Sequence, residues 1–245
     1  MTVKKPRYRR ILLKLSGEAL MGEKSFGIDP AVLKTVAKEV CGLHEQGVEI
    51  AIVVGGGNIF RGLNSSEYGM GRVSADHMGM LATVINAIAL GEALNHLGTQ
   101  ARTMSAVEMN QIAEPYVRGK ALSHLEKGRV LLLGGGTGNP YFSTDTAAAL
   151  RAMELHADVL LKATKVDGVY SSDPVKNPAA KPFSRLTYQE VLKRNLQVMD
   201  LSAVALAMAQ NLPILVFNLR KKGNIQKAIF RGNVGTLISG GPHEG

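Results

Sequence analysis

Two segments of the sequence share one design, an apolar strand that runs directly into three consecutive glycines. Residues 50–54 (IAIVV) lead into residues 55–57, and residues 130–133 (VLLL) lead into residues 134–136. Glycine has no side chain, so such a turn can bring backbone N–H groups against a bulky anion. A helix that begins just after the turn adds its partly positive N-terminus. One such turn is ambiguous, but two of them, with residues 14–17 (KLSG) after a third strand, indicate an enzyme that handles phosphates.

The bulk composition fits a compact intracellular protein. The chain has 245 residues, of which 45% are hydrophobic, enough for one large α/β domain or two closely joined halves. The single cysteine, Cys41, excludes an internal disulfide, which is typical of a reducing cytoplasm. The N-terminus has no signal-peptide pattern, and residues 78–91, the longest run without an ionisable side chain, are too short to span a bilayer. We therefore expect a cytoplasmic protein that is not inserted in a membrane.

The net charge of +9 is compatible with nucleic-acid binding and equally with polyanionic substrates. The strongest basic cluster, residues 4–10, lies at the terminus, and the chain has no Trp to form a stacking platform. We interpret this cluster as a solvated arm and do not expect specific nucleic-acid binding. A nucleic-acid-binding regulator stays as an alternative from another functional class.

Apolar runs alternate with amphipathic segments along the whole chain, which predicts a mostly parallel sheet covered by helices. No linker divides the sequence, so we expect a single domain over residues 1–245. A stretch rich in Asp, Ser, Asn and Pro, residues 167–185, is long enough to indicate a functional connection. The expected strands are 11–15, 50–54, 101–104, 130–133, 159–162, 213–217 and 235–238. The expected helices are 30–45, 75–97, 116–127, 145–156, one that begins after residue 187, and 202–209.

Local signals define several of these helices. Asp29 and Pro30 supply an N-cap and a first-turn proline, and Thr187 with Glu190 forms a capping box. The long helix over 75–97 has an apolar face at helical spacing. That face is formed by Leu81, Val84, Ile85 and Ile88.

Phosphoryl transfer needs a cradle for the donor phosphates, cations that neutralise developing charge, and an acceptor held in line. The chain lacks the P-loop motif and the motifs of protein kinases. Lys14, at the end of the first strand, can supply a cation, with Ser16 and Gly17 donating to phosphate. Alone, Lys14 would better fit a lysine at a strand end that points into solvent.

Six segments, in order and spread over essentially the whole chain, resemble bacterial uridylate kinases, a branch of the amino acid kinase family. They are residues 14–20 (KLSGEAL), 55–62 (GGGNIFRG), 76–83 (DHMGMLAT), 136–140 (GTGNP), 161–169 (LKATKVDGV) and 198–201 (VMDL). The resemblance implies the amino acid kinase fold, a three-layer α/β/α sandwich with a mostly parallel central sheet. It assigns residues 1–155 mainly to UMP binding and residues 156–245 mainly to ATP binding.

The same resemblance implies transfer of the ATP γ-phosphoryl group to UMP, giving UDP and ADP, a step of pyrimidine nucleotide biosynthesis. Mg²⁺ would enter with ATP and be held mainly through the phosphates rather than by a protein metal site. The resemblance also implies a homohexamer, inhibition by UTP and, in many members, activation by GTP. The alternative within enzymes is a kinase of the same fold that acts on a carbamate or an amino-acid derivative.

Carried over by position, the resemblance names residues for each part of the reaction. Lys14 and Lys162 would flank the transferring group, Arg61 would lie between donor and acceptor, and Asp200 would orient Lys14, while Asp145 fits a helix cap. ATP would contact Lys14, Leu15, Ser16, Gly17, Gly57, Arg61, Thr164, Tyr170 and Asp173. UMP would contact Gly56, Asp76, Thr137, Gly138, Asn139, Pro140, Tyr141, Phe142, Ser143 and Thr144. GTP would act through Gly22, Glu23, Lys24, Ser25, Phe26, Gly27, Arg102 and Arg129.

Overall fold

A computed structural model describes residues 5–60, 69–172, 174, 176–177, 179–230, 232 and 234–241. The strands in this part of the chain are β1 (Arg10–Leu15), β2 (Glu49–Val54), β3 (Ala101–Ser105), β4 (Glu114–Pro115), β5 (Val130–Gly134), β6 (Val159–Thr164), β7 (Arg185–Thr187), β8 (Ile214–Asn218) and β9 (Thr236–Ser239). The helices are a short 3₁₀ turn η1 (Gly17–Leu20), α1 (Pro30–His44), α2 (Arg72–His96), α3 (Arg118–Glu126), α4 (Thr144–Glu154), α5 (Tyr188–Lys193), α6 (Leu201–Ala209) and α7 (Asn224–Phe230).

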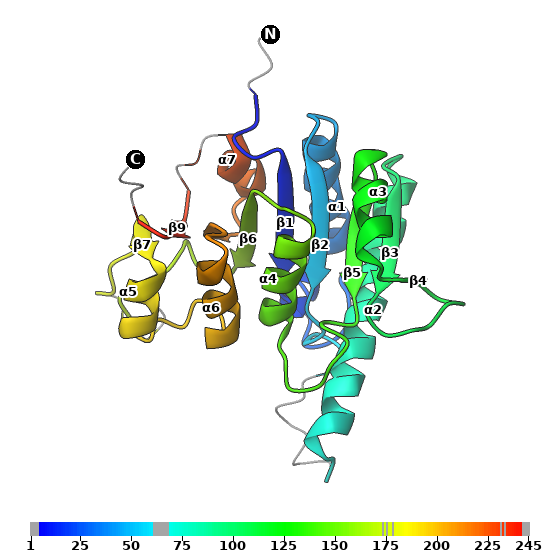
Figure 1. The fold of residues 1–245 in the computed structure, drawn as a ribbon, viewed down its shortest axis with the longest axis horizontal. Coiled ribbons are helices and arrows are strands. Elements are labelled where there is room, and N and C mark those ends of the chain that lie inside the picture. The colour runs from blue at the N-terminus through cyan, green and yellow to red at the C-terminus, as the bar shows by residue number, and fades with distance from the viewer. Residues whose placement is uncertain are drawn as a thin grey trace.

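All of these strands belong to one sheet with the order β4-β3-β5-β2-β1-β6-β8-β9-β7. Neighbouring strands run parallel except β8 and β9, which are antiparallel. Strand β1, from the first half of the chain, pairs with β6, from the second half, in the centre of the sheet (Figure 1). The two halves therefore share one continuous sheet, and their strand ends meet along one edge.

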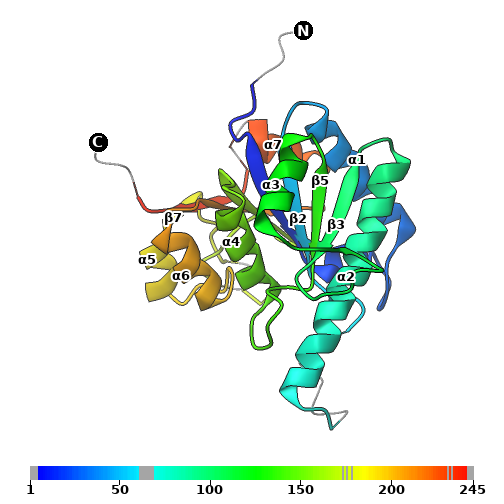
Figure 2. The same cartoon turned by 45° about the vertical axis from the view of Figure 1, so that its right-hand side comes forward.

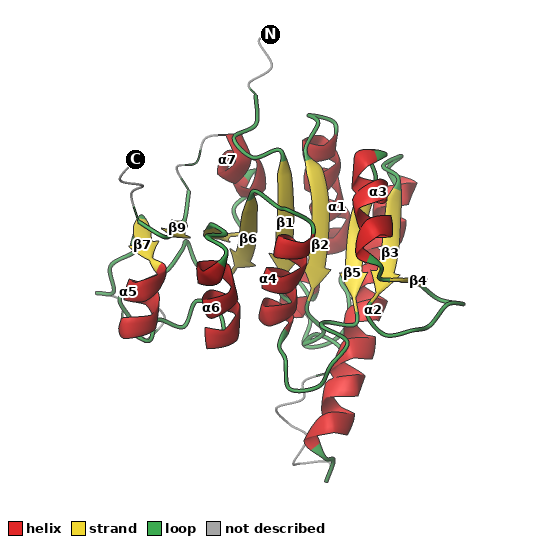
Figure 3. Cartoon of the chain, in the orientation of Figure 1, coloured by secondary structure: helices red, strands yellow, loops and turns green. Residues whose placement is uncertain are grey.

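Helices cover both faces of the sheet, so the predicted three-layer α/β/α architecture is confirmed (Figures 1 and 3). Successive residues of a strand point to opposite faces, and β1 shows this directly. Ile11, Leu13 and Leu15 pack with α1, α2 and α7, whereas Leu12 packs in the core that α3, α4, α5 and α6 complete. Lys14 lies two residues after Leu12, so its side chain points to the same face of the sheet, toward α4. Figure 2 shows the two helical layers from a second side.

Helix α2 is the longest element, and its N-terminal part extends beyond the sheet (Figure 1). It is long and apolar enough, by length and composition only, to be a candidate membrane span, yet its C-terminal part packs against the sheet as a core helix. The apolar face expected from the sequence packs only in part: Val84 is 4% exposed, but Leu81 and Ile85 are 51% and 50% exposed. The packed face combines large apolar residues such as Leu90 with small or polar ones such as Asn86.

Helix boundaries follow local capping chemistry. The Asp29 carboxylate accepts from the backbone N–H groups of Ala31 and Val32, and Thr187 and Glu190 form the expected capping box. Four expected helices begin one to three residues away from the predicted position: α2, α3, α4 and α6 start at residues 72, 118, 144 and 201 instead of 75, 116, 145 and 202. Ser143, one residue before Thr144, caps α4, and Asp200 rather than Ser202 caps α6. The strands β4 and β7 and the helix α7 were not expected, because each is only two to seven residues long and carries little periodic signal.

Candidate active site

Three charged side chains meet at the carboxyl ends of β1 and β6. Lys14 Nζ lies 2.6 Å from Asp145 Oδ1, and Lys162 Nζ lies 2.6 Å from Asp145 Oδ2. The two strands bring the lysines side by side, since Lys14 and Lys162 are partners in the β1–β6 register. Asp145 comes from the first turn of α4. The three side chains are only 9–14% exposed, so a single carboxylate holds two ammonium groups together away from bulk water.

This cluster shifts the pKa values of its members. Burial alone would raise the pKa of Asp145, but the neighbouring charges of Lys14 and Lys162 outweigh it and hold the pKa below its usual value. Burial lowers the pKa of Lys162, and the charge of Lys14 adds to this, although Asp145 opposes it. The site therefore keeps an ionised carboxylate at neutral pH and a lysine that loses its proton more readily than a free one.

Asp200, which was expected to orient Lys14, has a different position. Its carboxylate caps α6 by accepting from the N–H of Ala203, and it accepts hydrogen bonds from the hydroxyls of Ser143 and Thr146. The partner of Lys14 is Asp145, so the expectation for Asp200 is corrected. Asp200 instead ties α6 to the start of α4. The Lys162 ammonium also donates to the carbonyl of Val198, in the loop before Asp200.

The first triple glycine, residues 55–57, is packed too closely for side chains. A Cβ at Gly56 would lie 2.8 Å from both the Ala82 Cβ and the Gly79 carbonyl oxygen of α2. On the other side of the turn, a Cβ at Gly17 would lie 2.7 Å from the Gly55 oxygen and the Gly57 nitrogen. The turn is thus held between the loop after β1 and helix α2. Glycine is needed for this close approach at Gly56, and Gly55 is nearly as restricted, since its Cβ would lie 3.0 Å from the Gly17 nitrogen.

The second triple glycine, residues 134–136, needs glycine for its backbone conformation. Gly135 and Gly136 have φ values of 77° and 59°, and Gly138 has 84°, in the left-handed region that favours glycine. Tyr141 is also left-handed, with φ of 72°, and its N–H donates to Asp76 at 2.7 Å. Asp76 therefore fixes the loop that joins β5 to α4.

A cavity of about 160 Å³ lies between the two glycine turns and the start of α2. It brings together six of the residues expected to contact UMP, namely Gly56, Asp76, Thr137, Phe142, Ser143 and Thr144. Phe60, Met80 and Thr83, which the sequence analysis did not name, complete its wall. The Thr83 hydroxyl accepts from the Gly135 N–H at 2.8 Å, so this residue also links α2 to the second turn. Gly138, Asn139, Pro140 and Tyr141 are not part of the wall.

A second cavity, of about 500 Å³, opens beside the end of β1. Its lining includes Ser16 and Thr164, both expected to contact ATP, and Gly22 and Glu23, both expected to take part in activation by GTP. Lys165 and Arg220 also line it. The Leu15 side chain is fully buried in the core, so only its backbone is near this region. Tyr170 forms an isolated bridge with Pro182 in the long connection.

Other expected residues are separated or lie elsewhere. Arg61 and Asp173 fall outside the described residues. Arg102 and Arg129 lie near the amino ends of β3 and β5, where Arg129 contacts His124 and Gln100. The segment 22–27 lies at the carboxyl ends of the central strands, where Gly27 bonds to Asn58. Within one chain, the two sets of residues expected for GTP therefore do not meet.

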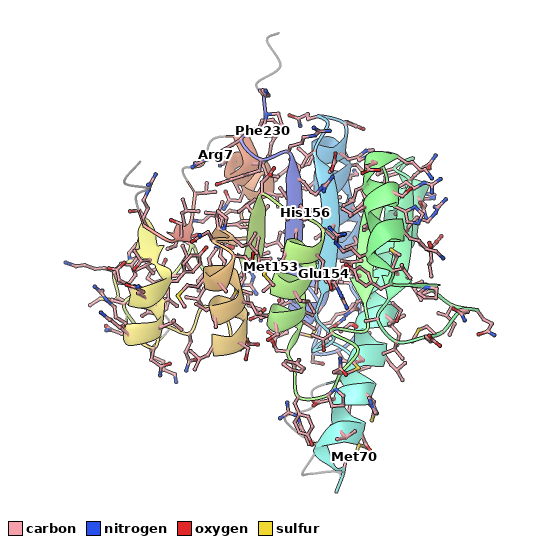
Figure 4. All side chains as sticks on the ribbon, viewed as in Figure 1. Arg7, Met70, Met153, Glu154, His156 and Phe230 are labelled. Atoms are coloured by element: carbon pink, nitrogen blue, oxygen red, sulfur yellow. The ribbon has the colours of Figure 1, made fainter. Side chains whose placement is uncertain are left out.

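The side chains confirm which end of the sheet carries the site. Figure 4 labels Met153, Glu154 and His156 at the C-terminal end of α4, and Asp145 stands in the first turn, at the opposite end. Figure 4 also labels Met70, which precedes α2 at the far end of its projection. The described residues contain no group of three or more His, Cys, Asp or Glu that could hold a metal ion.

Comparison with known proteins agrees with this geometry. Residues 9–218 match the sequence profile of the amino acid kinase family. The chain belongs to the amino acid kinase family. The crystal structure of UMP kinase from Bacillus anthracis is similar, with a TM-score of 0.92 and 40% identity over 95% of this chain and 96% of that one. UMP kinase from Ureaplasma parvum has a TM-score of 0.88 and 37% identity, over 95% and 99% of the two chains. Uridylate kinase from Archaeoglobus fulgidus has a TM-score of 0.74 and 29% identity, over 94% and 99%.

For this amino acid kinase family member, the structure adds Asp145 as the central residue of the cluster. The sequence held one signal for it: a carboxylate in the first turn of a helix that follows a glycine turn. That pattern is also typical of a helix cap, so it could not identify the contact with two distant lysines.

Proposed function

We propose that the protein transfers the γ-phosphoryl group of ATP to UMP, giving UDP and ADP, as a step of pyrimidine nucleotide biosynthesis. The main support is the position of the Lys14–Asp145–Lys162 cluster at the carboxyl ends of β1 and β6, next to β2 and the glycine turn that follows it. Glycine turns bind phosphates through backbone N–H groups, and the lysines place positive charge where phosphoryl oxygens gather charge in the transition state. The similarity to three UMP or uridylate kinases supports UMP as the acceptor.

The transfer is direct. A phosphate oxygen of UMP attacks the γ-phosphorus, the bond to the ADP oxygen breaks, and no side chain carries the phosphoryl group. Lys14 and Lys162 stabilise the charge on the transferring oxygens, and Asp145 holds their ammonium groups in place. Lys14, Leu15, Ser16, Gly17 and Gly57 are assigned to the donor phosphates, with Arg61 between donor and acceptor. Thr164, Tyr170 and Asp173 are assigned to the rest of ATP.

The acceptor site is the cavity between the turns. Asp76 lines it with a carboxylate, which suits ribose hydroxyl donors and would repel the UMP phosphate. The cavity wall is otherwise formed by small, apolar and hydroxyl side chains, among them Phe60, Met80 and Thr144.

Mg²⁺ is proposed to enter with ATP and to be held mainly by nucleotide oxygens. The carboxylates at the site are committed to protein groups: Asp145 to two lysines, and Asp200 to Ser143, Thr146 and the cap of α6. When bound, the ion neutralises phosphate charge and helps to align donor and acceptor.

Assembly and regulation are also proposals. Homohexamer formation is supported by the exposed apolar stripe of α2, where Met78, Leu81 and Ile85 repeat at helical spacing. UTP is proposed to inhibit by occupying the acceptor region. GTP is proposed to activate through Arg102 and Arg129 together with segment 22–27, which needs a second subunit because these parts are separated within one chain. We place the enzyme in the cytoplasm.

The test is an ADP-release assay with ATP, Mg²⁺ and a panel of acceptors. UMP should be phosphorylated in strong preference to AMP and GMP, and activity should require the divalent cation. Glutamate, aspartate and carbamate belong in the same panel, because they are acceptors for the alternative kinase. Equal turnover of purine nucleotides, or turnover of an amino acid, would contradict the proposal.

A further inference from the structure

The first glycine turn is followed by a buried pair of amide side chains. Asn58, directly after the turn, is 2% exposed, and Asn86, in the middle of α2, is fully buried. Asn58 Nδ2 donates to Asn86 Oδ1 at 3.0 Å, and Asn86 Nδ2 donates to Asn58 Oδ1 at 2.7 Å. None of the residue roles assigned above uses either side chain.

The remaining hydrogens of the pair reach two loops. Asn86 Nδ2 donates to the Gly55 carbonyl at 2.7 Å, and Asn58 Nδ2 donates to the Gly27 carbonyl at 2.9 Å. All four amide hydrogens therefore have an acceptor, which a buried polar pair requires. The Gly27 N–H donates back to the Asn58 carbonyl at 2.8 Å, so Asn58 and Gly27 are joined by two bonds.

The pair thus joins three parts of the chain: the turn at residues 55–57, segment 22–27 and helix α2. Asn58 also lies against the loop after β1, because a Cβ at Gly17 would collide with its amide oxygen. Asn58 and Asn86 are too deeply buried to contact nucleotides in this arrangement. Their position is suited to fixing a phosphate-binding backbone that offers no side chains of its own for packing.

We infer that Asn58 and Asn86 form a positioning pair, which sets the place of the Gly55–Gly57 backbone relative to α2 and to segment 22–27. The inference rests on the proposed function, because the turn is assigned to the substrate phosphates. A displaced turn would still bind nucleotides but would hold donor and acceptor out of line, and a small misplacement of this kind reduces kcat.

The experiment compares Asn58→Ala, Asn86→Ala, the double variant and Asn95→Ala. Asn95 is the matched control: it lies on α2, and its side chain accepts from the Ala101 N–H far from the turn. Each single variant should lower kcat for UMP phosphorylation by about tenfold to a hundredfold, with a much smaller change in KM. The double variant should lose about as much as the worse single one, because the pair acts as a unit. Asn95→Ala should keep its kcat.

Hydrogen exchange of the amides provides a readout independent of the substrate. Both single variants should exchange faster at residues 55–57 and 22–27, whereas Asn95→Ala should not. If the native enzyme fails to phosphorylate UMP, the proposed function falls, but this exchange result still supports the positioning role. Should an alanine variant not fold, Asn86→Asp keeps the side-chain volume and removes both hydrogen bonds that Asn86 Nδ2 donates, to the Gly55 carbonyl and to Asn58 Oδ1. Unchanged exchange, unchanged kcat with a lowered Tm, or multiplicative losses in the double variant would overturn the inference.

Discussion

The two triple-glycine turns are nearly identical in sequence, but they need glycine for different physical reasons. At residues 55–57 none of the glycines has positive φ. A side chain is excluded there by lack of space, since Gly56 lies against Ala82 and Gly79 of α2. At residues 134–136 a second limit is added: a Cβ at Gly134 would also be too close, 2.9 Å from Val84 Cγ2, but Gly136 has open space around it and is restricted by its φ of 59°. The first turn is therefore a packed junction, and the second is a left-handed bend.

This difference matches what each turn does in the site. The first turn is fixed against α2 and the loop after β1, which suits a rigid backbone surface for phosphates. The second turn redirects the chain from β5 into α4, and so delivers Asp145 to the lysines of β1 and β6. The first turn is the one proposed to bind phosphates by its own backbone, whereas the second positions a charge further along the chain.

The largest effect is expected at Lys14, which lies at the end of β1 next to the first turn and contacts Asp145, the carboxylate that follows the second turn. Lys14→Ala should lower kcat by about two orders of magnitude, because a cation that acts in the transition state is worth ~3–4 kcal/mol. Steady-state kinetics on this variant and on Lys120→Ala, an exposed lysine far from the cluster, measure the effect. A near-normal kcat in Lys14→Ala would make Lys14 a structural residue.

The charge delivered by the second turn should matter more than the neighbouring carboxylate of Asp200. Asp145→Asn leaves two buried ammonium groups without a counter-charge, and breaking a buried pair typically costs ~3–5 kcal/mol of stability. Both its kcat and its Tm should fall. Asp200→Asn should change the Tm little, because Asn caps a helix about as well as Asp. The opposite ranking of the two variants would restore Asp200 as the partner of Lys14.

Substitution of the glycines tests the comparison itself. At Gly136, Ala should cost about 1–2 kcal/mol of folding free energy for its left-handed φ, and Asn should cost less, since Asn tolerates that region. At Gly56 the order should reverse, because both side chains clash and the larger one clashes more; overpacking costs about 1–3 kcal/mol. Denaturant unfolding of the four variants gives these values. The same order of Ala and Asn at both positions would show that the turns do not differ in this way.

The smallest effect concerns pH. Because the pKa of Lys162 is lowered by burial, its ammonium loses a proton at lower pH than a free lysine. The kcat of the native enzyme should therefore decline on the alkaline side before a normal lysine titrates. Lys162→Arg, whose charge persists, should shift that decline to higher pH even if its maximal kcat is lower. If the alkaline decline of kcat does not move in Lys162→Arg, that decline is due to another group.

The pKa of Asp145 is lowered, so its contribution to stability is present at neutral pH and is lost only in acid, as pH falls through that pKa.

Sequence reasoning located the local features of the fold well. The strands that lead into glycine turns, the cap at Asp29 and the capping box of Thr187 and Glu190 all depend on neighbouring residues, and the structure confirms them. Family resemblance supplied the fold class, and six of the residues that it assigns to UMP line one cavity.

What could not be predicted depends on contacts between distant segments. Asp145 reaches Lys14 only because β5, α4 and β1 converge, and nothing near Asp145 in the sequence marks that contact. The packed face of α2 was predicted only in part: Val84 is buried as expected, whereas Leu81 and Ile85 are exposed and the polar Asn86 is buried. The Asn58–Asn86 pair, 28 residues apart, is equally invisible to periodicity.

The most direct test of the central claim follows the phosphoryl group itself. The enzyme is incubated with Mg²⁺ and ATP labelled at the γ-phosphate, with UMP, AMP or GMP as acceptor or with none. Direct transfer by the Lys14–Asp145–Lys162 site predicts that, with UMP, labelled UDP forms in an amount equal to the ADP released from ATP. With AMP or GMP as acceptor, little labelled ADP or GDP should form. No label should be found on the protein. Label bound covalently to the protein when no acceptor is present, or equal labelling of all three nucleotides, would contradict it.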